Sequence, residues 1–67
     1  MVNAGAVRLL LLENNINGAT VEQVTNYVKV RIPTLTPGDK KAVQTMFTAM
    51  GWKALILPGN SFIVTDK

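Results

Sequence analysis

Six side chains that can form hydrogen bonds or ion pairs are concentrated between residues 40 and 53. They are Lys40, Lys41, Gln44, Thr45, Thr48 and Lys53. A lysine ammonium group pairs with phosphate or a guanine edge, a glutamine amide matches adenine, and a threonine contacts the backbone or a thymine methyl group. Because a helix turns by about 100° per residue, Lys41, Gln44, Thr45 and Thr48 would share one helix side. This pattern predicts a DNA contact surface, and its alternative is an ordinary solvated helix face.

The segment that must position these side chains has clear helix signals. Thr36 is a suitable N-cap, Pro37 suits the first helical position, and the negative charge of Asp39 favours the positive end of the helix dipole. Gly51 is the expected helix end. The apolar side of this helix is formed by Val43, Met46, Phe47 and Met50. We therefore predict an amphipathic helix that begins after Thr36 and ends before Gly51.

Two further helices are predicted ahead of it. The first runs from an N-cap at Asn3 to about Asn14, where the sequence "NNING" favours a helix end. The second covers residues 20–32, because "TVEQ" has the form of a capping box and valines follow at helical spacing. Pro33 ends this second helix, since the residue before a proline avoids the helical region.

The C-terminal segment predicts a β-hairpin. "WKALIL" and "SFIVT" are rich in strand-forming residues, and "PGN" between them is a turn signal. Ile16 is the candidate for a short third strand. The predicted fold is therefore α+β, a single winged helix-turn-helix domain over residues 1–67, with three helices and a C-terminal hairpin.

The segment "TPGDKKAVQTMFTAMGWKA" resembles the C-terminal winged module of phage and plasmid primase-helicase proteins and of the related virulence-associated E proteins. The matching residues are Asp39, Lys40, Lys41, Met46, Met50, Gly51, Trp52 and Lys53. The resemblance implies a non-enzymatic, DNA-binding module of a phage or mobile element that docks through its third helix, with Lys40 and Lys53 on phosphates. For Trp52, stacking on a base is the alternative to a place in the core, which we favour.

The first predicted helix contains an unbroken aliphatic run, Leu9, Leu10, Leu11 and Leu12. A lone surface helix normally has one apolar stripe, and this run covers most of a turn. Either two sides of the helix are buried within the domain, or one side meets another chain or another part of a parent protein. We favour partial exposure, which gives the second hypothesis for function: a protein-interaction or oligomerisation module that uses this helix.

Composition excludes several classes of function. The chain has no cysteine and no histidine, and its four acidic residues are scattered, so we expect no metal site, no cofactor and no enzyme activity. A phosphate-binding GxxxxGK[ST] loop is absent from the sequence. The longest aliphatic run is far shorter than the roughly 18 residues of a membrane span, and nothing marks a signal peptide, so we expect a cytoplasmic protein.

The net charge of +3 is compatible with nucleic acid without being diagnostic of it. Two more cations, Lys29 and Arg31, can contact phosphates or simply keep the protein soluble, and we favour solubility. The predicted hairpin tip "LPGNS" carries no cation, so we expect little affinity from it.

Overall fold

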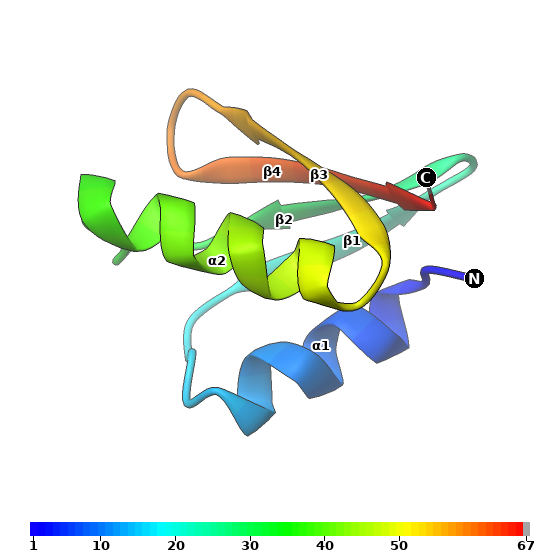
Figure 1. Ribbon diagram of the computed structural model, residues 1–67, viewed down its shortest axis with the longest axis horizontal. Coiled ribbons are helices and arrows are strands. Elements are labelled where there is room, and N and C mark those ends of the chain that lie inside the picture. Colours follow the sequence, from blue (N-terminus) through cyan, green and yellow to red (C-terminus); the bar gives the residue numbers. More distant parts are fainter. Residues whose placement is uncertain (67) are drawn as a thin grey trace.

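The computed structural model describes residues 1–66 as an α+β fold, with two helices on one side of a four-stranded antiparallel sheet (Figure 1). The elements are α1 (Ala4–Glu13), β1 (Thr20–Val24), β2 (Tyr27–Arg31), α2 (Pro37–Ala49), β3 (Trp52–Leu57) and β4 (Ser61–Asp66). The sheet order is β1-β2-β4-β3, so β4 lies between the two strands that α2 connects. The predicted α+β class is therefore confirmed.

Both predicted caps are present. The Asn3 side chain accepts a hydrogen bond from the Ala6 amide at 2.8 Å and starts α1. The Thr36 hydroxyl accepts from the Asp39 amide at 3.4 Å and donates to its carboxylate at 2.8 Å. Gly51 follows α2 with a φ of +85°, a conformation in which any side chain would be strained. The predicted α1, α2 and β3–β4 hairpin are confirmed.

The helix predicted over residues 20–32 is wrong, because this segment forms the β1–β2 hairpin around a turn at Thr25 and Asn26. Residues 1–66 therefore contain two helices, where three were predicted. The misleading signal was "TVEQ": the Gln23 side chain accepts from the Ala4 amide at 2.9 Å instead of completing a capping box. The informative signal was the alternation after the turn, where Val28 and Val30 are fully buried and their neighbours face the other way.

The short third strand expected near Ile16 is also wrong. Ile16 lies in the loop between α1 and β1, where its amide donates to the Leu11 carbonyl at 2.9 Å. Its side chain is half-buried against the core. The residue therefore anchors the loop onto the last turn of α1, and hydrophobicity was mistaken for strand pairing.

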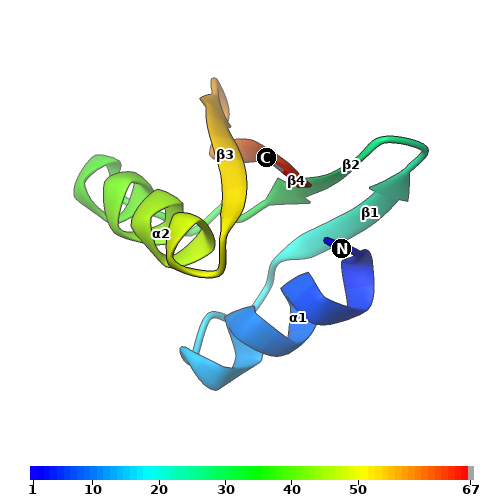
Figure 2. The ribbon, with the colours of Figure 1, turned by 45° about the vertical axis from the view of Figure 1, so that its right-hand side comes forward.

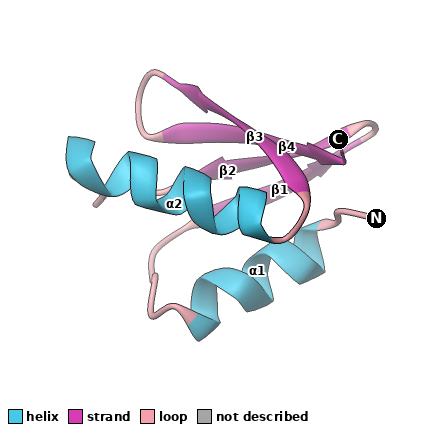
Figure 3. Ribbon diagram, viewed as in Figure 1, coloured by secondary structure: helices cyan, strands magenta, loops and turns pink. Residues whose placement is uncertain are grey.

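The hydrophobic core lies between the sheet and the two helices, which Figures 2 and 3 show on the same side of the sheet. From the helices it takes Val7, Leu11, Val43 and Phe47, and from the strands Val28, Val30, Ala54, Phe62 and Val64. The ring of Phe47 packs against that of Phe62 edge-on, with centroids 5.8 Å apart. The two ends of the described range also approach each other, since the Val2 amide donates to the Asp66 carboxylate at 2.7 Å.

The fold is built from two helix–hairpin units that the sequence pattern did not predict. The α1-β1-β2 unit and the α2-β3-β4 unit meet along β2 and β4, which pair in an antiparallel register. A two-fold rotation that carries Val28 onto Phe62 also carries Val64 onto Val30, so the paired residues Val28–Val64 and Val30–Phe62 change places. The same rotation carries the pair Lys29–Ile63 onto itself. The register therefore has an approximate two-fold axis at this pair, perpendicular to the sheet.

Candidate nucleic-acid interface

The outer side of α2 carries three of the six predicted contact residues. Lys41, Thr45 and Thr48 are exposed there. The Thr45 hydroxyl donates to the Lys41 carbonyl at 3.0 Å, and the Thr48 hydroxyl donates to the Thr45 carbonyl at 2.9 Å. Because both hydroxyl protons are used within the helix, these threonines offer acceptors but no donors to a ligand. On this side of α2, Lys41 is left as the strongest contact group.

Gln44 has a structural role that the helical pattern did not suggest. Its side-chain amide donates to the Ala54 carbonyl of the edge strand β3 at 2.9 Å, and the residue is half-buried. The edge of a sheet has backbone groups without strand partners, so this bond satisfies one of them. Pairing of the same amide with adenine would require breaking that bond.

Lys40, at the start of α2, is also half-buried.

Lys53 lies on the opposite side of the sheet from α2. Its neighbour Ala54 is buried beneath the helix, and successive side chains of a strand point to opposite faces. The structure therefore does not bring the six predicted residues together. Lys40, Lys41, Thr45 and Thr48 belong to α2, while Lys53 belongs to the sheet face that neither described helix covers.

That uncovered sheet face, called the open face below, carries the cations of both hairpins. Lys29, Arg31 and Lys53 are all exposed on it, and Glu22, opposite Lys29 in the register, is the one acid that residues 1–66 place there. Arg31 stands between Thr20 and Ser61, and Lys53 stands opposite Thr65. Such a surface attracts phosphate groups, because its positive charges outnumber the negative one.

The open face also has apolar side chains beside the cations. Ile63 lies between Lys29 and Leu55 in the register, and Leu55 is 51% exposed. Tyr27, half-buried, stands opposite Val24 at the β1–β2 turn end of the face. Cations interleaved with apolar and aromatic side chains on one sheet face suit a ligand with both phosphates and exposed bases.

Sequence reasoning underrated this surface because residues 20–32 were assigned to a helix. Strand alternation in "YVKVRI" sets Tyr27, Lys29 and Arg31 on one face, opposite the buried valines. Helical geometry would have distributed the same three side chains around an axis. The two-residue period was the signal that identifies the open face.

Trp52 packs against the core, as expected, with its ring centroid 6.4 Å from that of Phe47. The α2 side of the core is formed by Val43 and Phe47, whereas Met50 is 51% exposed although the sequence pattern placed it inside. The apolar stripe of α2 is therefore narrower than the sequence suggested.

The chain matches no protein-family model, no curated protein and no solved structure. Of the two described helices, neither has the length and apolar character needed to cross a bilayer. Across residues 1–66, no three side chains of the metal-ligating types converge. Geometry and charge are therefore the basis for any assignment of function.

Proposed function

We propose that this protein is a non-enzymatic nucleic-acid-binding module that binds single strands on its open face. The observation that supports this proposal is the gathering of Lys29, Arg31 and Lys53 beside Tyr27 and Ile63 on one uncovered side of the sheet. Proteins that bind single strands combine cations along the backbone with flat side chains against which bases stack. The open face offers both kinds of side chain.

The open face suits a single strand better than a duplex. A duplex presents its bases only as edges within grooves, which an α-helix or a two-stranded ribbon can enter. A broad sheet face meets a duplex chiefly at its phosphates, so Tyr27 and the aliphatic side chains would gain no partner. An unpaired base, in contrast, can lie flat on Tyr27, Leu55 or Ile63.

The alternative is docking of α2 in the major groove, as the winged helix-turn-helix prediction requires. That arrangement depends on a helix before the recognition helix, and the β1–β2 hairpin occupies this part of the chain. It also depends on side chains free to read base edges, whereas Gln44 is bound to Ala54 and the two threonine protons are bound within α2. Lys40 and Lys41 remain as its contacts, so the two surfaces can be tested separately.

Fluorescence anisotropy with a labelled single-stranded oligonucleotide and its duplex, at low and moderate salt, tests the proposal. We expect the single strand to bind more tightly, with an affinity that falls steeply as salt increases. The Lys29→Ala/Arg31→Ala variant should weaken this binding and reduce the salt slope by about 0.7 for each phosphate that the variant no longer neutralises. Lys40→Ala/Lys41→Ala is the matched control, because it removes the same charge from α2.

The possible results distinguish binding at the open face from binding at α2. If the α2 variant loses duplex binding while the open-face variant keeps it, docking in the groove is correct and the open face is not the site. If neither oligonucleotide binds at low salt, the nucleic-acid proposal fails. Replacing Tyr27 by alanine should cost about 1–3 kcal/mol per stacked base, and replacing it by phenylalanine should cost little.

A further inference from the structure

The outer side of α1 is apolar where the matched side of α2 is polar. Leu9 is 59% exposed and Leu12 is 61% exposed, while Leu11 of the same run is buried. When the buried pair Val7 and Leu11 is matched with Val43 and Phe47 of α2, Leu9 and Leu12 correspond to Thr45 and Thr48. The two exposed leucines lie outside the core, and α2 shows that the fold accepts threonine at the equivalent positions. A contact outside this chain explains them better than the fold does.

Two charges flank the leucines in a self-complementary pattern. On a helical projection, Leu9 and Leu12 lie about 60° apart, with Arg8 about 40° beyond Leu12 and Glu13 about 40° beyond Leu9. If two α1 helices pack parallel about a two-fold axis along their length, Leu9 meets the partner's Leu9 and Leu12 meets the partner's Leu12. Because this axis exchanges the two flanks of the interface, Arg8 lies against the partner's Glu13 on both flanks. A two-fold interface requires this kind of reciprocal match.

We propose that this face, formed by Arg8, Leu9, Leu12 and Glu13, binds a second copy of the chain as a parallel helix pair. Leucine contacts supply the apolar burial, and two equivalent Arg–Glu pairs at the rim set the direction and register. The interface lies on α1, away from the open face, so it does not depend on the nucleic-acid proposal.

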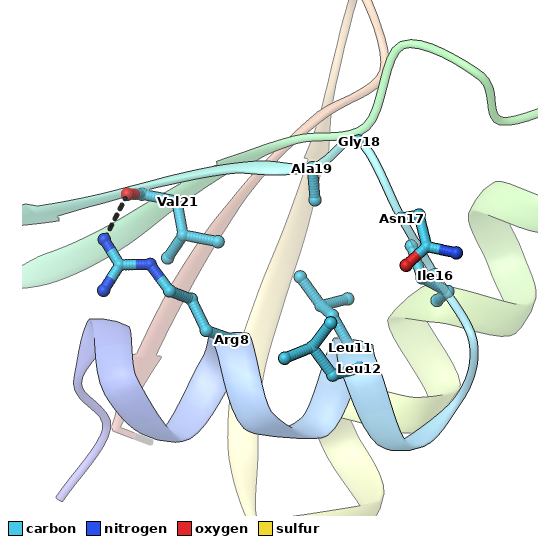
Figure 4. A pocket seen from close by; sticks show the side chains of 8 residues that line it. All are labelled: Arg8, Leu11, Leu12, Ile16, Asn17, Gly18, Ala19 and Val21. Atoms are coloured by element: carbon cyan, nitrogen blue, oxygen red, sulfur yellow. Dashed lines mark hydrogen bonds between the residues drawn. The ribbon is translucent and has the colours of Figure 1, made fainter.

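A hollow beside α1 gives this interface a second point of complementarity. It has a volume of about 170 Å³ and is lined by Arg8, Leu11, Leu12, Ile16, Asn17, Gly18, Ala19 and Val21. Figure 4 shows Leu12 at its wall and Ala19 across from α1. Small-molecule sites usually measure about 300–1,000 Å³, so this hollow has the size for one or two side chains. Because the partner's Leu12 meets Leu12 in the proposed register, it arrives at the rim of this hollow.

Arg8 is already oriented for the proposed contact. One of its terminal nitrogens donates to the Val21 carbonyl of the edge strand β1 at 3.2 Å (Figure 4). A guanidinium group has five N–H donors, so others are left for a carboxylate. Glu13 is the last residue of α1, whose final turn contains no basic residue, and its charge is unfavourable at the negative end of the helix dipole. The partner's Arg8 would compensate that charge.

Analytical ultracentrifugation of the full chain, from about 10 µM to about 2 mM, tests the proposal. One short helix pair makes a small interface, so we expect a reversible dimer with a dissociation constant between about 10 µM and about 1 mM. Leu9→Asp/Leu12→Asp should remain monomeric over the whole range. Thr45→Asp/Thr48→Asp changes the matched positions of α2 and should dimerise like the original chain. Circular dichroism checks that both variants fold, which we expect because all four positions are exposed.

Charge exchange tests the register. Arg8→Glu and Glu13→Arg should each weaken the dimer about tenfold, because both ion pairs become repulsions. The double exchange should restore the original dissociation constant to within about threefold, although it also lacks Arg8 and the bond to Val21. A chain that stays monomeric at the highest concentration overturns the proposal. So does a dimer that the leucine variant leaves intact, and a double exchange as weak as the single ones overturns the parallel register.

Discussion

The two helix–hairpin units share their buried positions and differ on their surfaces. Val7 and Leu11 of α1 correspond to Val43 and Phe47 of α2, and all four are buried. At the matched outer positions, α1 has leucines and α2 has threonines. Since both units have the same architecture, this contrast indicates that the outer residues are free to vary with whatever each surface contacts.

The open face shows the same divergence between its two halves. The β1–β2 half carries Glu22, Lys29 and Arg31 beside Val24 and Tyr27, whereas the β3–β4 half carries only Lys53 beside Leu55, Leu57 and Ile63. The first half is therefore the more charged and the second the more apolar. This asymmetry is what we expect of a surface that contacts one elongated ligand, with most of its phosphate contacts on one half.

The greatest loss of stability is expected at the matched core residues Leu11 and Phe47. Phe47→Ala should cost about 3–5 kcal/mol, since the ring contacts both Phe62 and Trp52, and this is most of the stability of a domain of this size. Leu11→Ala should cost about 2–3 kcal/mol, because Leu11 contributes less buried volume than the phenylalanine. Urea denaturation followed by circular dichroism measures both. A larger loss for Leu11→Ala would show that α1, not α2, dominates the core.

Substitutions at the two helix caps should lower the free energy of unfolding by less than those in the core, and the two losses should differ only slightly. Asn3→Ala should cost about 1 kcal/mol, because its oxygen accepts from the Ala6 amide at 2.8 Å. Thr36→Ala should cost about 0.5 kcal/mol, since the corresponding bond to Asp39 is 3.4 Å long. The measurement is again the free energy of unfolding, with Asn3→Ser and Thr36→Ser as variants that retain a capping oxygen. Equal losses at both caps would contradict the ranking.

Each unit also uses one side chain of its helix to bind an edge carbonyl, and these bonds should differ in strength. Gln44 and Arg8 occupy matched positions and donate to Ala54 and Val21. Gln44→Ala should cost about 1 kcal/mol, because its bond is partly buried, and Arg8→Ala only about 0.5 kcal/mol, because its bond is exposed. Thermal unfolding monitored by circular dichroism tests both, with Gln44→Glu as a variant that keeps the size of the side chain but lacks the donor.

The outer positions of α2 should be the least sensitive to substitution. Thr45→Leu/Thr48→Leu copies the leucines of α1 and should change the free energy of unfolding by no more than about 0.5 kcal/mol. The positions that match Arg8 and Glu13 are occupied by Gln44 and Ala49, so the new leucines lack a charged rim. Sedimentation should therefore show no new association with a defined stoichiometry. A second, stable dimer form would mean that leucines alone specify the contact.

Local signals in the sequence were sufficient for α1, α2 and the β3–β4 hairpin. Asn3, Thr36 and Gly51 act through bonds or backbone angles within a few residues, so their roles are readable without the fold. The β1–β2 hairpin was missed because valines at helical spacing competed with an alternating pattern only a few residues long. For a segment that short, pairing with β4 decides between helix and strand.

The amino-acid sequence was enough to predict the α+β class and the two helices with their ends, and it supplied the candidate contact groups, which are ammonium, amide and hydroxyl groups. Which of those groups are available to a ligand depends on the packing of the elements. That packing binds Gln44 to Ala54, turns Lys53 away from α2, and sets it on the same side of the sheet as Lys29 and Arg31. The physical reason is that caps and turns are short-range, whereas the face of a strand depends on partners far away in the chain.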